Sequence, residues 1–177
     1  MLSRIFTPFP ILKTERLTLR QLVNDDEQEI FILRSDSEIN KYLDRQISET
    51  IEDARNFINK INENVIKNDS LYWAITLSKK NILVGTICLS GFSDETDKCE
   101  IGYELLINFQ GQGIMKEALE AVIDYAFATM KVQEIMATLH KDNQGSIKLL
   151  EKFSFRHINE TDITDHDLMC FYLKKNN

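Results

Sequence analysis

The sequence contains little proline, glycine and cysteine, and it has no long apolar run. Its 177 residues include two prolines, six glycines and three cysteines, and no apolar stretch approaches the roughly 20 residues needed to span a bilayer. Cys88, Cys99 and Cys170 are odd in number and lack Cys-x-x-Cys spacing, which argues against a disulfide framework and a zinc site. We therefore expect buried or half-buried thiols in a reducing compartment.

Linkers, repeats and excess positive charge are missing as well. No Gly/Ser/Pro-rich segment interrupts the chain, so we expect a single domain over residues 1–177. The net charge of −7 argues against a general nucleic-acid or anionic-membrane binder, because such proteins present broad basic faces. It is compatible with cationic partners such as amines or basic protein tails. Pro8 and Pro10 interrupt the first apolar residues and no small-residue cleavage site follows, so we expect no signal peptide and a cytoplasmic protein.

The spacing of apolar residues predicts a strand, two helices and three more strands in the first part of the chain. Apolar and polar residues alternate over residues 15–22, which is typical of a strand. One helix is expected over residues 24–35. A second begins near Thr50, whose spacing to Asp53 resembles a capping box. An antiparallel meander is then expected from strands at residues 71–78, 82–92 and 98–107.

After Gly113 the apolar spacing becomes helical. The elements expected beyond this helix are a strand at residues 134–141, a helix at 144–152, and strands at 153–158 and 167–175. One mixed sheet with helices on its faces accommodates this order, which predicts an α/β (α+β) fold.

The segment from Gln110 to Lys116 joins the third meander strand to the following helix. The first amides of a helix lack internal acceptors and carry partial positive charge, and glycines let a backbone approach an anion closely. A pyrophosphate suits such a site, and the alternative is a plain connector. Gly113 is followed by Ile114 and Met115, which excludes a Walker loop. Lys116 stands where a Rossmann fingerprint requires glycine or alanine.

The same segment resembles the acyl-CoA-binding signature of the GNAT N-acetyltransferases, Gln/Arg-x-x-Gly-x-Gly/Ala. Gln110 and Gly113 match its first two defined positions, and Met115 stands at the last. Four further segments are similar to the branch that includes the RimJ/RimL ribosomal-protein N-acetyltransferases and the spermidine acetyltransferases: TERLTLRQL, CEIGYEL, KEALEAVIDYAF and DNQGSIKLLEKFSF. Ser154 replaces the glycine of the usual Leu-Gly-Phe ending. The resemblance implies a GNAT domain with a central mixed, mostly antiparallel sheet flanked by helices on both faces.

The resemblance also implies acetyl-CoA as co-substrate. The pantetheine arm is expected alongside the strand from Tyr103 to Ile107, with Leu105, Leu106 and Ile107 as its contacts, in a gap where this strand splays from the one at residues 134–141. Asn143 is expected to reach the arm, and it also suits a helix N-cap. The loop residues expected at the pyrophosphate are Gln110, Gly111, Gln112, Gly113, Ile114, Met115 and Lys116.

In the resembling family a neutral amine attacks the thioester directly. Glu104 is the candidate base, acting directly or through water, and Glu100 on the same strand face is its reserve. The alternative for both is that they flank a groove or pair with cations. An N–H near Leu105 is expected to stabilise the oxyanion. Leu150 stands where many members supply a tyrosine acid, so Ser146 becomes the candidate acid, with a water relay or direct thiolate release still open.

We therefore expect an acetyl-CoA-dependent N-acetyltransferase that acts on a protein N-terminal amine, as in ribosomal proteins, or on a small amine. One alternative is a non-catalytic acyl-CoA-binding or sensing module. Another is a nucleotide-binding domain unrelated to CoA, which requires a parallel sheet around Gly111. We expect no metal, nucleic-acid or membrane partner, and a homodimer is compatible with the resemblance. Loops at residues 42–50 and 162–167 are expected to shape the acceptor site.

Overall fold

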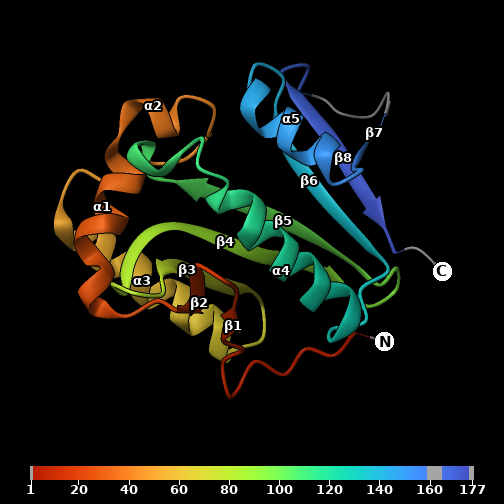
Figure 1. Cartoon of the computed structure of the whole chain (residues 1–177), viewed down its shortest axis with the longest axis horizontal. Coiled ribbons are helices and arrows are strands. Elements are labelled where there is room, and N and C mark those ends of the chain that lie inside the picture. The colour runs from red at the N-terminus through yellow and green to blue at the C-terminus, as the bar shows by residue number, and fades with distance from the viewer. Residues whose placement is uncertain (1, 159–164, 176–177) are drawn as a thin grey trace.

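A computed structural model describes residues 2–158 and 165–175, and its strands form one eight-stranded sheet (Figure 1). The strand order is β1-β2-β3-β4-β5-β6-β8-β7. Six of the seven neighbouring pairs are antiparallel, and β5 with β6 is the parallel pair. The predicted mixed, mostly antiparallel sheet is therefore confirmed. The strands are β1 (Leu12–Lys13), β2 (Leu17–Gln21), β3 (Leu71–Leu77), β4 (Ile82–Ser93), β5 (Lys98–Leu105), β6 (Glu134–His140), β7 (Arg156–Ile158) and β8 (Leu168–Lys174).

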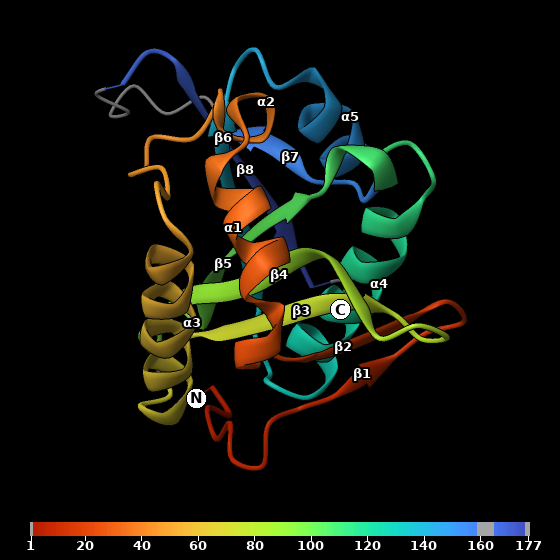
Figure 2. The same ribbon diagram turned by 90° about the vertical axis from the view of Figure 1, so that its left-hand side faces the viewer.

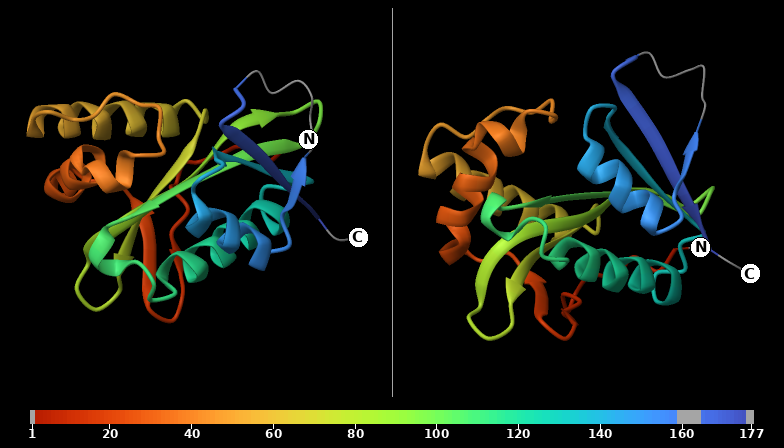
Figure 3. Two further views of the ribbon diagram at one scale, coloured as in Figure 1. Left: turned by 90° about the horizontal axis from the view of Figure 1, so that it is seen from above. Right: turned by 45° about the horizontal axis from the view of Figure 1, so that its top comes forward.

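Helices cover both faces of the sheet, as predicted (Figures 2 and 3). The first three pack on one face, and the last two lie on the other, where their apolar residues join one core. The helices are α1 (Glu27–Ser35), α2 (Ser37–Asn40), α3 (Ile51–Ile66), α4 (Ile114–Ala128) and α5 (Gln144–Lys152), with 3₁₀ turns at Asn24–Asp26 and Ile107–Phe109.

The period of two in the strands explains how the sheet separates two apolar layers. Leu17 and Leu19 of β2 are fully buried against the α4 face, whereas Ala74 of β3 is buried towards α1 and α3. Trp73 is also fully buried, and its indole N–H donates to the Pro10 carbonyl at 2.7 Å. This bond leaves the largest side chain of the core without an unpaired polar atom.

The second predicted helix begins as expected, and the first begins later. Thr50 and Asp53 form the predicted capping box at the start of α3. Residues 24–26 form a 3₁₀ turn instead of helix, because the Asp26 carboxylate is held by Arg20 at 2.8 Å and accepts the Val23 N–H. The helix α1 therefore starts only at Glu27.

Two of the predicted strands were too long. The strand expected over residues 98–107 ends at Leu105, because the chain turns into a 3₁₀ turn that contains Ile107. The strand expected over residues 153–158 is only Arg156–Ile158, since Ser154 adopts a left-handed conformation (φ 63°) in the turn after α5. The short elements β1 and α2 were not predicted.

The order β5-α4-β6 is a parallel crossover unit attached to an antiparallel meander. The parallel register covers only Lys98 to Glu100 of β5, opposite Glu134 to Met136 of β6. The long partner of β5 on its other side is β4, which runs antiparallel. A doubly wound dinucleotide-binding fold has a mostly parallel sheet, whereas β5 and β6 form the one parallel pair here and the other six pairs are antiparallel.

The cysteines are free, as expected. Cys99 is buried, and Cys88 and Cys170 are half-buried. Burial raises the pKa of both Cys88 and Cys99 to about 12, which keeps these thiols protonated and unreactive. Across residues 2–158 and 165–175, no helix has the length and apolar character needed to cross a membrane.

Candidate active site

The loop before α4 presents a row of unused backbone amides. Gly111 and Gly113 have φ of 73° and 76°, values that glycine adopts without strain. The first helical bond runs from the Glu117 N–H to the Gly113 carbonyl at 3.1 Å. Within the described chain, none of the N–H groups of residues 111–116 donates to a protein acceptor. Aligned donors at a helix N-terminus form a site for an anion such as a phosphate.

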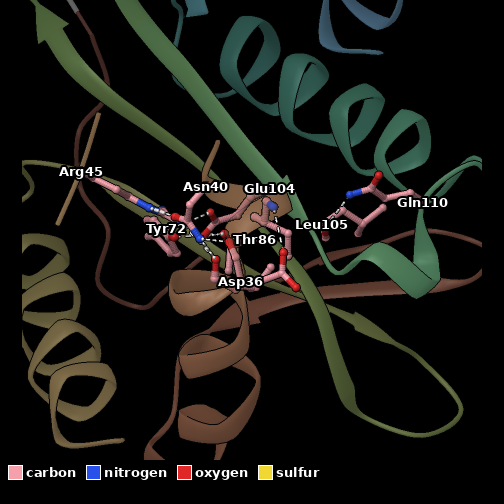
Figure 4. A network of polar contacts seen from close by, with 10 residues as sticks. Asp36, Asn40, Arg45, Tyr72, Thr86, Glu104, Leu105 and Gln110 are labelled. Carbon is pink, nitrogen blue, oxygen red and sulfur yellow. Dashed lines mark hydrogen bonds and ion pairs between the residues drawn. The ribbon is translucent and has the colours of Figure 1, made fainter. Parts of the chain in front are cut away.

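Side chains of the loop hold it in shape. Gln110 donates from Nε2 to the Leu105 carbonyl at 3.1 Å, and Gln112 donates from Nε2 to the Asn108 carbonyl at 2.8 Å. Gln110 thus ties the loop to the end of β5 (Figure 4). The side-chain amide of Gln110 therefore holds the loop, with its row of backbone amides, at a fixed distance from β5.

Arg16 and Glu117 clamp the same loop to the edge of β2. Glu117 accepts from Thr14 Oγ1 at 2.5 Å, from the Arg16 N–H at 2.9 Å and from Arg16 Nε at 2.6 Å. Arg16 also donates to the Gln112 carbonyl at 3.0 Å. Burial opposes ionisation of Glu117, but these hydrogen bonds outweigh it and lower its pKa. These contacts were not predicted, although Thr14 and Arg16 lie in the TERLTLRQL segment.

The residues that follow the glycines divide between core and surface. Ile114 and Met115 are buried in the apolar layer under α4, whereas Lys116 is exposed. Met115 occupies the position where the GNAT signature has a small residue. Because its side chain packs into the core, it does not cover the amide row.

A gap opens between β5 and β6 beside this loop (Figures 1 and 3). The two strands stop pairing after Glu100 and Met136, although β5 continues to Leu105 and β6 to His140. The Leu106 N–H donates to Val84 of β4 at 2.9 Å. By strand alternation the Leu105 N–H therefore points to the opposite edge, into the gap. An extended ligand arm can pair with this open edge.

Across the gap, α5 brings Ser146 and Asn143 towards β5. Ser146 Oγ donates to the Tyr103 hydroxyl at 2.8 Å, and burial raises the pKa of Tyr103 to about 12. Asn143 caps α5 by accepting the Ser146 N–H at 3.2 Å, as its alternative interpretation predicted. Leu150 is fully buried in the core, so it lies outside the gap. Tyr103 was placed in the strand expected beside the pantetheine arm, but no role was predicted for its hydroxyl.

Glu104 lies on the other face of β5, towards α1 and α3 (Figure 4). Its Oε2 is 2.6 Å from Arg45 Nη2, in a direction that makes an ion pair rather than an aligned hydrogen bond. Its Oε1 accepts from Thr86 Oγ1 at 3.3 Å, and Thr86 contacts the Tyr72 hydroxyl at 3.0 Å. The side chain is only 8% exposed. The carboxylate is therefore a fixed, partly shielded group that pairs with a cation, one of the two alternatives left open above.

The loop after α2 reaches this face of the site. Arg45 comes from that loop, and it also donates to Asn40 Oδ1 at 2.7 Å and to the Leu33 carbonyl at 3.1 Å. Tyr42 stacks on His140 at the end of β6, with ring centroids 5.3 Å apart. Residues 162–164 of the other expected acceptor loop lie outside the described residues. Glu100, the reserve base, is exposed.

Candidate metal ligands do not gather near these groups. Among residues 2–158 and 165–175, no group of three His, Cys, Asp or Glu side chains has the spacing to hold an ion. The site as described consists of an amide row, an open strand edge, a Ser146–Tyr103 hydroxyl pair and a buried Glu104 carboxylate. This set suits transfer of a group from a phosphate-bearing carrier whose extended arm lies along a strand.

Comparisons with known proteins agree with this geometry. Residues 16–156 match the model of the acetyltransferase (GNAT) domain family. The uncharacterized N-acetyltransferase p20 of Bacillus licheniformis is 32% identical over 145 residues, which is 82% of each chain. A GNAT-family acetyltransferase of Bacillus anthracis has a similar crystal structure, with a TM-score of 0.78, 27% identity and coverage of 93% of this chain and 98% of that one.

A more distant structural neighbour carries coenzyme A. It is RimL, a ribosomal L7/L12 α-N-protein acetyltransferase in complex with coenzyme A, with a TM-score of 0.82, 18% identity and coverage of 93% and 98%. At this identity the likeness concerns the fold alone. The family model and the relatives in Bacillus go further, and on that basis the chain belongs to the GNAT acetyltransferases and is an N-acetyltransferase.

Proposed function

We propose that this protein is an acetyl-CoA-dependent N-acetyltransferase of the RimJ/RimL branch, acting as a single domain over residues 1–177. It transfers an acetyl group directly to a primary amine, either a protein N-terminal α-amine or a small amine. The observation that carries the proposal is the amide row at residues 111–116 next to the open edge of β5. GNAT enzymes use acetyl-CoA, and these two features match its pyrophosphate and its pantetheine arm.

In the proposed complex, the pyrophosphate sits on the amides of residues 111–116, and the arm pairs with β5 along the gap. The strand ends at Leu105, so Leu106 and Ile107 contribute to the turn that leads the arm to the loop. The Oδ1 of Asn143 accepts the Ser146 N–H at the N-cap of α5. Its amide nitrogen has no acceptor within the described chain and is available to the arm.

The base in this proposal is Glu104, which takes the proton of the attacking amine directly or through water. Arg45 occupies one of its oxygens and fixes the other near Thr86. A protein α-amine has a pKa of about 7.7–8.0 and a lysine about 10.4, so an N-terminal acceptor needs less help from this carboxylate. As the C–N bond forms, the Leu105 N–H donates to the developing oxyanion.

Ser146 and Tyr103 act together on the leaving group. Ser146 donates to the Tyr103 oxygen, so the phenol O–H is left to donate a hydrogen bond to the thioester sulfur. With a pKa of about 12, Tyr103 is a weaker acid than an ordinary thiol of pKa about 8.5. The C–S bond therefore breaks to give a thiolate that Tyr103 stabilises by a hydrogen bond, and the thiolate takes its proton from solvent.

Two measurements test the proposed function. Calorimetric titration with acetyl-CoA should show saturable binding, and a panel of polyamines, amino acids and peptide N-termini should include acceptors that release free CoA thiol. Binding without thiol release from any amine would favour the alternative, a non-catalytic acyl-CoA-binding or sensing module. No binding at millimolar acetyl-CoA would refute both.

We also propose a cytoplasmic location and a homodimeric state. The free thiols of Cys88, Cys99 and Cys170 suit a reducing compartment, and dimers are common in the resembling family. Sedimentation of the purified protein at micromolar concentration tests the dimer, and a monomer would contradict it.

A further inference from the structure

Arg34 is a half-buried cation with unused hydrogen-bond donors. It lies in the last turn of α1, and its guanidinium carbon is 3.9 Å from the ring centroid of Phe57. A guanidinium has five N–H donors. Within the described chain, no carboxylate or carbonyl accepts from the Arg34 side chain. Stacking on Phe57 fixes the planar group without satisfying any of these donors.

A half-buried arginine side chain without a hydrogen-bond acceptor is unusual among the described arginines. Arg45, the nearest one, uses its donors on Asn40, Leu33 and Glu104. Arg156 is exposed on β7, where water satisfies its donors. The remaining arginines each pair with a carboxylate: Arg4 with Asp94, Arg16 with Glu117, Arg20 with Asp26 and Arg55 with Glu27.

The charges around Arg34 do not balance. Burial and then the charge of Arg45 lower the pKa of Arg34, and Glu104 is the carboxylate that opposes them. Asp36, two residues after Arg34, caps α2 through its Oδ1, which accepts the Glu38 and Ile39 N–H groups. Two guanidiniums thus face one carboxylate. Taking an unpaired charge partly out of water is costly, and one more anion would remove that cost.

The same face holds the proposed base. Arg34 stacks on Phe57, Phe57 packs edge-on against Tyr72 with ring centroids 5.6 Å apart, and Tyr72 contacts Thr86, which donates to Glu104. The unpaired cation and the base are therefore linked by one continuous chain of packed side chains between α1, α3 and β5. An acceptor that brings its amine to Glu104 brings its neighbouring groups to Arg34.

We propose that the acceptor carries a carboxylate close to its amine, with the amine at Glu104 and the carboxylate on the guanidinium of Arg34. This inference rests on the proposed function and specifies its acceptor class. The chemistry has two sources: the α-carboxylate of a free amino acid, or an acidic side chain next to the N-terminal residue of a peptide. Because planar guanidiniums bind carboxylates with paired hydrogen bonds, the site distinguishes such acceptors from neutral amines.

Matched acceptor pairs test this assignment. Phenylalanine is compared with phenethylamine, and the peptide amide Ser-Asp-Ala with Ser-Asn-Ala, by measuring kcat/KM through CoA thiol release with the whole protein. We expect the carboxylate-bearing member of at least one pair to be preferred by about tenfold or more. Preference in the first pair identifies a free amino acid, and preference in the second identifies an acidic peptide.

Variants of Arg34 separate this contact from general effects. Arg34→Met retains apolar packing on Phe57 and should abolish the preference, because kcat/KM falls more for the carboxylate-bearing member of a pair than for the neutral one. Arg34→Lys keeps the charge but not the planar guanidinium, so it should retain part of the preference. The same variant also shows whether a loss in Arg34→Met comes from a folding defect. Arg55→Met, which removes an exposed arginine paired with Glu27, should leave the preference unchanged.

Several outcomes would overturn the inference. Equal kcat/KM for both members of each pair would do so, as would an equal loss for both members in Arg34→Met. If acetyl-CoA binds but only neutral amines release thiol, the acceptor class is wrong and the proposed function stands. If acetyl-CoA does not bind, the proposed function itself fails and this inference fails with it.

Discussion

Removal of the Tyr103 hydroxyl tests how the leaving thiolate is stabilised. Tyr103→Phe keeps the ring on β5 but removes the group that Ser146 contacts at 2.8 Å. A hydrogen bond to a charged group contributes about 1.5–3 kcal/mol. At 1.36 kcal/mol per factor of ten, this corresponds to a loss of roughly 10- to 150-fold in kcat. The KM for acetyl-CoA should change little, because the amide row and the β5 edge are intact.

Ser146→Ala distinguishes the two roles of the pair. If Ser146 acts through Tyr103, its removal lowers kcat less than Tyr103→Phe does, and it adds little in the Tyr103→Phe background. The assay is steady-state thiol release at saturating acetyl-CoA, combined in a double-mutant cycle. Tyr125→Phe is the matched control, since Tyr125 lies in α4 against Trp73, with ring centroids 5.8 Å apart, away from the gap. Independent, multiplicative losses would show that Ser146 acts directly on sulfur, and an unchanged kcat in Tyr103→Phe would refute the reasoning.

Three further changes address the loop, the clamp and the turn after α5. Gly113→Ala forces alanine to φ 76° with its Cβ 3.5 Å from Arg16, and it should cost about 1–2 kcal/mol and weaken acetyl-CoA binding in calorimetry; unchanged affinity would contradict the amide-row assignment. Glu117→Gln should lower the melting temperature at neutral pH. The folded-state pKa of Glu117 is depressed, so its contribution is present above the unfolded value of about 4.3 and is lost as pH falls through the folded value, where the two melting curves should converge. Ser154→Gly relieves the left-handed φ of 63° and should stabilise the protein by about 0.5–1 kcal/mol in urea unfolding; a loss of stability would show that the serine side chain contributes more than the strain costs.

Local patterns allowed the sequence to predict the meander, the helix at residues 144–152 and the capping box at Thr50. Each depends on residues within one turn or one alternation, where the period and the cap chemistry leave little choice. The helix predicted from residue 24 began at Glu27, because Arg20 holds Asp26 in a 3₁₀ turn. That contact is tertiary, and a periodicity argument cannot detect it.

The site was predicted only where it depends on residues that are close together in the sequence. The loop and the open strand edge follow from a contiguous motif, whereas the Ser146–Tyr103 bond joins residues 43 positions apart. Arg45 belongs to a loop without a regular pattern, so its ion pair with Glu104 depends on where α2 places that loop. Met115 stands where the GNAT signature has a small residue, and sequence position does not tell which way its side chain points. In the folded protein it points into the core.

The proposed reaction depends on the alternation of three consecutive residues of β5. Tyr103 points towards α5 and the proposed leaving group, Glu104 points towards α1 and α3, and the Leu105 N–H lies in the strand edge between them. A thioester held at that edge would meet the amine from one face of the sheet and release its thiolate towards the other. The proposed base and the proposed thiolate partner therefore lie on opposite faces of the sheet. The period of two in a strand thus lets one short segment present the proposed base and the proposed thiolate partner on opposite faces, and insertion of one residue before Tyr103 would exchange the two faces.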